Sequence, residues 1–119
     1  MKTTDKQIIK KLTPEKAFQL IQQNLNNPDF IILDLRPPKK YIKAKIKNAI
    51  NFDYNKENFD ENLEKLDKNK TYFIYCTFGL KSNITIELME ELGFREVYCI
   101  DEGLIKWKNQ GFEISYNTQ

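Results

Sequence analysis

Two almost continuous apolar runs constrain the fold of this chain more than any other feature of its 119 residues. FIILDL occupies residues 30–35, and TYFIY occupies residues 71–75, directly before Cys76. Such runs are typical of parallel β-strands covered on both faces, because a strand with one solvated face would alternate apolar and polar residues. The two runs therefore predict a parallel sheet with helices packed on each side.

Helical patterns alternate with these strands and favour the same α/β architecture. Thr13 and Pro14 give an N-cap followed by a first-turn proline. Apolar residues then recur at helical spacing in three stripes: Ala17, Leu20, Ile21 and Leu25; Phe59, Leu63 and Leu66; and Ile84, Leu88 and Leu92 in a helix over residues 82–92 that ends at Gly93. A last helix is expected over residues 104–110, closed by Gly111, and shorter strands over residues 8–12, 49–52 and 97–100.

Length and composition limit the organisation and the location of the chain. A hydrophobic content of 40% suits one domain over residues 1–119, with its core at about residues 8–114. No apolar run approaches the ~20 residues of a membrane helix, and residues 1–12 lack the run of about 7–15 apolar residues of a secretory signal. We therefore expect a cytoplasmic protein without a membrane partner.

The absence of histidine excludes several kinds of catalytic site. A Cys–His pair, a Ser–His–Asp triad and a histidine-ligated metal are all impossible. The two cysteines, Cys76 and Cys99, match neither a zinc pattern nor a disulfide framework. We therefore expect no metal, no cofactor and two free thiols.

Charges are nearly balanced in number but unevenly spread. The net charge of +2 is too small to predict a nucleic-acid partner. Residues 39–47 contain five lysines and no acid, whereas residues 53–67 contain six acids and two lysines. Solvated surfaces explain both runs, and the lysine-rich segment could also dock an acidic partner or attract an anion.

The segment YCTFGLKS, residues 75–82, is the candidate functional motif. It places Cys76 at the carboxyl end of a strand and just before a helix, where ligands commonly bind in such folds. Loop amides, the helix N-terminus and the charge of Lys81 all favour a thiolate, and Gly79 lets the backbone approach the sulfur closely. A thiol can thus act as a nucleophile without a histidine base. The alternative is a cysteine that only fills the core.

The sequence also resembles the rhodanese-like single-domain sulfurtransferases, from about Ile8 to Ile114. The resemblance lies in KKLTPEKAFQLI, IILDLRPPKKYIKAKIKNAINF, YFIYCTFGLKS with LMEELGF, and VYCIDEGLIKWKNQGFEI. It implies a three-layer sandwich with a mostly parallel five-stranded sheet and helices on both faces. It also implies that Cys76 accepts sulfur as a persulfide, within a substrate-binding loop of Thr77, Phe78, Gly79, Leu80, Lys81 and Ser82.

Several residues near this loop depart from the family pattern. Lys45 stands where histidine is more common, Lys40 where an acidic partner for Arg36 is common, and Glu102 where a glycine is usual. We interpret Asp34 and Arg36 as a structural ion pair at the end of a buried strand, and a direct catalytic role for either residue is the alternative.

The remaining candidate side chains are expected to be structural. We interpret Trp107 as a core anchor for the last helix. Cys99 is expected on a strand parallel to and beside the one that ends at Cys76, filling space beneath a helix; a resolving thiol is the alternative.

Three functions remain open at this point. The first is a sulfurtransferase that moves sulfur from a small anionic donor, through Cys76, to a thiol, cyanide or protein acceptor. The second is a cysteine-dependent phosphatase or arsenate reductase, which related folds provide; phosphatase loops place an arginine six positions after the cysteine, where this chain has Ser82. The third is a non-catalytic interaction module, against which the retained cysteine argues.

Overall fold

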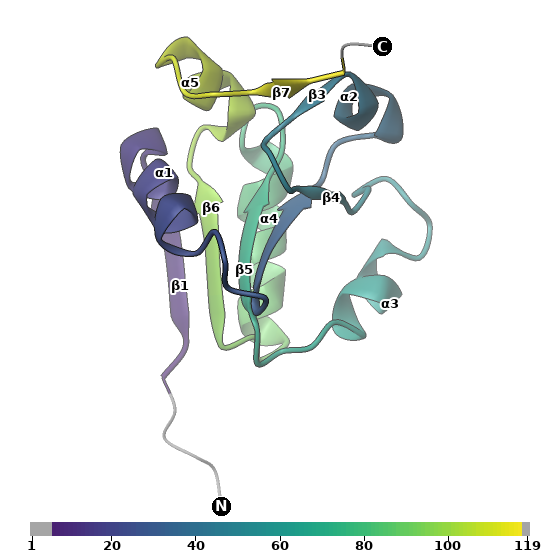
Figure 1. The fold of residues 1–119 in the computed structure, drawn as a ribbon. Helices are drawn as coiled ribbons and strands as arrows, with labels where there is room; N and C mark the ends of the chain where they lie inside the picture. Colours follow the sequence, from purple (N-terminus) through teal and green to yellow (C-terminus); the bar gives the residue numbers. More distant parts are fainter. Residues whose placement is uncertain (1–5, 118–119) are drawn as a thin grey trace, which may run out of the picture.

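A five-stranded parallel sheet forms the centre of the computed structural model, which describes residues 6–117 (Figure 1). The strand order is β1-β6-β5-β2-β4, and every neighbouring pair is parallel. The strands are β1 (Ile8–Leu12), β2 (Phe30–Asp34), β4 (Ile50–Asn51), β5 (Thr71–Tyr75) and β6 (Glu96–Ile100). The two apolar runs thus become β2 and β5, which lie side by side, and the predicted α/β class is confirmed.

Within residues 6–117, five helices pack around the sheet: α1 (Pro14–Gln23), α2 (Pro38–Lys43), α3 (Phe59–Glu64), α4 (Leu80–Glu91) and α5 (Gly103–Asn109). The core divides accordingly, because side chains alternate along each strand. Ile74 and Cys76 face the cluster that α3 and α4 cover, and Phe73 and Tyr75 face the cluster that α1 and α5 cover. The expected three-layer sandwich is therefore confirmed.

The predicted apolar stripe of α4 is wrong at Ile84, whereas Leu88 and Leu92 pack against the core cluster. Ile84 is 48% exposed, and Leu88 and Leu92 are only half-buried. The buried face instead consists of Ser82, Thr85, Ile86 and Met89, and the helix begins two residues earlier than expected, at Leu80. Hydrophobicity misplaced this face because the side chains of Ser82 and Thr85, rather than that of Ile84, are directed toward the sheet.

Other differences from the prediction occur at short elements. Leu25 lies beyond the end of α1 and is 52% exposed, and the strand expected over residues 49–52 contains only Ile50 and Asn51. The sequence patterns did not indicate α2, or the two-stranded antiparallel sheet of β3 (Ala44–Lys45) and β7 (Ser115–Tyr116). Within residues 6–117, no helix combines the length and apolar character needed to cross a membrane.

Candidate active site

Cys76 directly follows the central strand β5, and the short loop of residues 77–79 separates it from the first residue of α4, Leu80. Its side chain is only 4% exposed and contacts the core beneath α4. The first N–H groups of an α-helix have no partner within the helix, and they carry the positive end of its dipole. The cysteine therefore lies where backbone donors gather.

Two of these donors contact the sulfur. The backbone N–H groups of Gly79 and Ser82 donate to Cys76 Sγ at 3.2 Å and 3.3 Å. The thiol donates to Ser82 Oγ at 3.5 Å, and the Ser82 hydroxyl donates to the carbonyl oxygen of Gly79 at 3.2 Å. The sulfur of Cys76 is therefore surrounded by two backbone N–H donors and one hydroxyl group.

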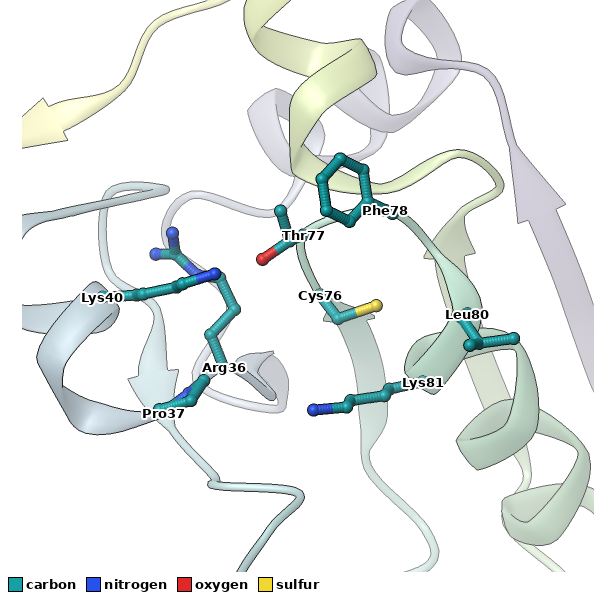
Figure 2. A pocket seen from close by; sticks show the side chains of 8 residues that line it. All are labelled: Arg36, Pro37, Lys40, Cys76, Thr77, Phe78, Leu80 and Lys81. Atoms are coloured by element: carbon teal, nitrogen blue, oxygen red, sulfur yellow. The ribbon is translucent and has the colours of Figure 1, made fainter.

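A cavity of about 230 Å³ opens over Cys76 (Figure 2). Its walls combine apolar and basic side chains with one hydroxyl-bearing residue, Thr77; the others are Arg36, Pro37, Lys40, Phe78, Leu80 and Lys81. Lys40 reaches toward the cavity from α2, and Lys81 reaches toward it from α4 on the other side of Cys76. Lys81 Nζ also lies 3.3 Å from Asn55 Oδ1 and 5.5 Å from the centre of the Tyr54 ring.

Backbone packing fixes the loop from behind. Gly79 has φ +95°, and a Cβ there would lie 2.3 Å from the carbonyl oxygen of Asp101. Gly103 has φ +78°, and a Cβ there would lie 2.5 Å from the Gly79 nitrogen. The N–H groups of Leu104 and Ile105 donate to the carbonyl oxygens of Cys76 and Thr77 at 2.8 Å and 3.0 Å. The start of α5 therefore supports the loop that surrounds the sulfur.

Asp34 and Arg36 form a buried ion pair beside this loop. Arg36 Nε and Nη2 donate to the Asp34 carboxylate at 3.0 Å and 2.8 Å, and the Tyr75 hydroxyl donates to it at 2.6 Å. Arg36 also donates to the carbonyl oxygen of Ala44, and Tyr75 accepts from the N–H of Ile46. Burial lowers the pKa of Arg36, but its contacts with Asp34 outweigh that effect and raise the pKa above the usual value.

Cys99 lies on β6, opposite Ile74 of the parallel neighbour β5, as expected. It is fully buried in the same cluster as Cys76, and its thiol lies 3.7 Å from Asn83 Oδ1 of α4. Burial raises the pKa of the Cys99 thiol to about 12. Among the described residues, both cysteines are free thiols, and no cluster of three acidic or thiol groups is placed to hold a metal ion.

The residues expected at the site occupy two different positions around the sulfur. Thr77, Phe78, Leu80 and Lys81 line the cavity, whereas Gly79 and Ser82 lie behind the sulfur and hydrogen-bond to it. Arg36, which was interpreted first as part of a structural ion pair, also lines the cavity.

Sequence reasoning missed three residues that shape the site. Pro37 and Lys40 line the cavity, and Gly103 packs against the loop. The lysine-rich segment 39–47 was a signal for Lys40. Only the fold, however, brings α2 over the end of β5.

Comparison with known proteins supports one family. The rhodanese-like domain family matches residues 17–110. The chain is 31% identical over 99 residues to the thiosulfate sulfurtransferase GlpE of Coxiella burnetii, covering 83% of this chain and 87% of that protein. It is 35% identical over 100 residues to the tRNA uridine(34) hydroxylase of Legionella pneumophila, covering 81% of this chain and 38% of the hydroxylase. The chain thus spans well under half the length of that relative.

A solved structure has the same architecture. The polysulfide-sulfur transferase of Wolinella succinogenes superposes with a TM-score of 0.70 at 24% identity, covering 94% of this chain and 81% of that one. This similarity concerns the fold, and the family match comes from the sequence. The parallel sheet with its two helical layers, the cysteine loop and the match over residues 17–110 lead to one conclusion: the chain belongs to the rhodanese-like domain family.

Proposed function

We propose that this chain is a sulfurtransferase that carries sulfane sulfur on Cys76. The observation that carries the proposal is the position of Cys76 Sγ, which lies at a cavity and accepts hydrogen bonds from the N–H groups of Gly79 and Ser82. A thiolate held in this way is a nucleophile that requires no histidine. The similarity to a thiosulfate sulfurtransferase over 87% of that protein supports the same reaction class.

The proposed reaction has two displacement steps. The Cys76 thiolate attacks the outer sulfur of an anionic donor such as thiosulfate, whose S–S bond breaks while sulfite leaves with the bonding electron pair. A thiolate or cyanide then attacks the terminal sulfur of the Cys76 persulfide, and the Cys76 thiolate leaves. The Gly79 and Ser82 amides lie close enough to Sγ to stabilise the anion at the end of each cycle.

The resemblance to the tRNA uridine(34) hydroxylase provides a second candidate, in which the domain contributes to the modification of a tRNA nucleotide. The lysine-rich segment, residues 39–47, would then contact phosphates. The two candidates differ in one observable. Sulfur transfer requires Cys76 to hold a sulfur atom, and binding of tRNA does not.

A phosphatase reaction is less compatible with the loop. The sixth position after the cysteine is Ser82, which is fully buried and bonds to Cys76 and Gly79, so no basic side chain reaches a bound phosphate from there. Hydrolysis of p-nitrophenyl phosphate should therefore proceed no faster with the native protein than with Cys76→Ser. Clear turnover that depends on Cys76 would favour the phosphatase instead.

The direct functional test is the formation of thiocyanate from thiosulfate and cyanide. Cys76→Ser should reduce this activity to background, because a hydroxyl cannot hold a persulfide, while the free energy of unfolding changes by about 1 kcal/mol or less. Cys99→Ala is the matched control, because it removes the other thiol, and it should retain the activity. Transfer that survives in Cys76→Ser would overturn the proposal.

A further inference from the structure

We propose that Asn55, in the segment between β4 and α3, is a positioning residue that holds the ammonium group of Lys81 at the Cys76 cavity without cancelling its charge. Asn55 is not among the residues that line the cavity, so it acts through Lys81. The inference rests on the proposed function, in which an anion approaches Cys76. Three features support it: the contacts of Lys81, the anchoring of the segment that carries Asn55, and the neutrality of the groups that make these contacts.

Two neutral groups contact the ammonium group of Lys81. Lys81 Nζ donates to Asn55 Oδ1 at 3.3 Å, and it lies 5.5 Å from the centre of the Tyr54 ring. A lysine side chain in the first turn of a helix otherwise samples many rotamers, and it loses this freedom when a bound anion orders it. Contacts that order Lys81 before the anion arrives therefore reduce the free-energy cost of binding that anion.

The segment that carries Asn55 and Tyr54 is anchored to the rest of the fold. The N–H of Tyr54 donates to the carbonyl oxygen of Leu35, just after β2, at 3.1 Å. The N–H of Asn55 donates to Asp53 Oδ1 at 2.9 Å. The Tyr54 ring packs on the Phe59 ring of α3, with the ring centres 4.9 Å apart. Because its backbone and its neighbour are fixed in this way, the Asn55 amide can hold a bonded group in one place.

The group that accepts from Lys81 is an amide, although the segment around it is acidic. Residues 53–67 contain six acids, yet none of the ion pairs found within residues 6–117 includes Lys81. A carboxylate at position 55 would also hold the ammonium group, but it would cancel most of the charge that a third group could feel. The Asn55 amide holds the same group and leaves its charge available to an anion at Cys76.

The position of Lys81 allows this charge to act near the sulfur. Lys81 lines the cavity, and Figure 2 shows its side chain reaching from α4 toward the cavity beside Cys76. A charge that is held in place in advance stabilises an anion without reorganising when the anion arrives. A neutral reagent gains nothing from the same charge. Asn55 should therefore accelerate the reaction of Cys76 with anions and leave its reaction with neutral molecules unchanged.

The test compares the rates at which Cys76 reacts with anionic iodoacetate and with neutral iodoacetamide, which are nearly equal in size. The ratio of the two rate constants measures the attraction of an anion and cancels changes in the reactivity of the sulfur itself. Asn55→Ala should lower this ratio about threefold, the size expected for one partly solvated charge, because Lys81 is no longer held at the cavity. Asn55→Asp should also lower the ratio, because the carboxylate cancels the charge. In Lys81→Met, the additional substitution Asn55→Ala should cause no further fall.

Asn58→Ala is the matched control, because Asn58 is an exposed asparagine of the same segment whose side chain makes no capping hydrogen bond to α3. It should leave the ratio unchanged. A ratio that stays constant or rises in Asn55→Ala, or that falls equally when Lys81→Met is already present, would overturn the inference. Alkylation requires no sulfur transfer, so it tests Asn55 independently of the proposed function. If thiosulfate places no sulfur on Cys76 while the ratios change as expected, the proposed function alone is wrong.

Discussion

Cys76 and Cys99 contact the same core cluster beneath α4, but only Cys76 lines the cavity. Strand geometry also keeps the two thiols apart. Cys99 is opposite Ile74, two residues before Cys76, which at ~3.3 Å per residue and ~4.8 Å between strands puts the two Cα atoms roughly 8 Å apart. A disulfide needs Cα atoms within about 7 Å. The single residue that we expect to react is therefore Cys76.

This difference predicts selective alkylation. Because burial raises the pKa of the Cys99 thiol to about 12, iodoacetamide at about pH 8 should modify Cys76 and leave Cys99 unmodified in the folded protein. Peptide mapping by mass spectrometry measures both sites, and the protein in urea serves as the control in which both should react. Peroxide treatment should likewise oxidise Cys76 without joining it to Cys99. A Cys76–Cys99 disulfide would show that the site uses two thiols.

At the scale of elements, the sulfur site depends on contact between two segments that are distant in sequence. The loop between β5 and α4 packs directly on the start of α5, where Gly103 allows an approach that no other residue permits. A Cβ at Gly103 would lie 2.6 Å from the Thr77 carbonyl oxygen as well as 2.5 Å from the Gly79 nitrogen. The position of the amides around Cys76 therefore depends on α5.

Gly103→Ala should displace the loop and lower transfer activity at least about tenfold, together with a loss of stability of about 1–3 kcal/mol. Thiocyanate formation and urea unfolding measure the two effects. Gly111→Ala is the matched control, because Gly111 also has a positive φ, +86°, but a Cβ there would meet nothing within 4 Å. It should lose stability through backbone strain and keep its activity. Equal activity in the two variants would mean that α5 does not position the loop.

The sequence predicted the elements whose signals are local. The strands β2 and β5 could be predicted because their sequences are almost continuously apolar. The motif at Cys76 could be recognised because it lies between a predicted strand and a predicted helix. The buried face of α4 could not be found by hydrophobicity, because Ser82 and Thr85 are buried where the isoleucine at position 84 is not. The pairing of β3 with β7 joins residues about seventy positions apart and involves only two residues on each strand. Such pairs leave no periodic pattern.

At the scale of the whole molecule, buried thiol and phenol groups make the stability of the fold depend on pH. Burial raises the pKa of Cys99 and, together with Glu96, that of Tyr98, each to about 12. Burial likewise raises the pKa of Tyr75 above its usual value. In the unfolded chain these groups would release their protons nearer to their usual values of 9.0 and 10.0. Above those values the folded state holds more protons than the unfolded state, so stability falls as the pH rises.

The free energy of unfolding should therefore be highest near neutral pH and should fall in alkaline solution. The urea concentration at the midpoint of unfolding should decrease as the pH is raised from about 8 to about 11. Each group that is protonated in the folded state and deprotonated in the unfolded state lowers the free energy of unfolding by up to about 1.4 kcal/mol per pH unit. Cys99→Ala and Tyr98→Phe should each flatten this dependence, because each removes one group that must be deprotonated on unfolding. A midpoint that stays constant over this range would contradict the account of these buried groups.

The most direct measurement of the central claim is the mass of the Cys76 peptide after the purified protein has been treated with thiosulfate. We predict a gain of one sulfur atom on that peptide, none on the Cys99 peptide, and loss of the added sulfur when cyanide follows. An unmodified Cys76 peptide from folded protein, or a sulfur atom found on Cys99 instead, would contradict the assignment of Cys76 as the sulfur carrier.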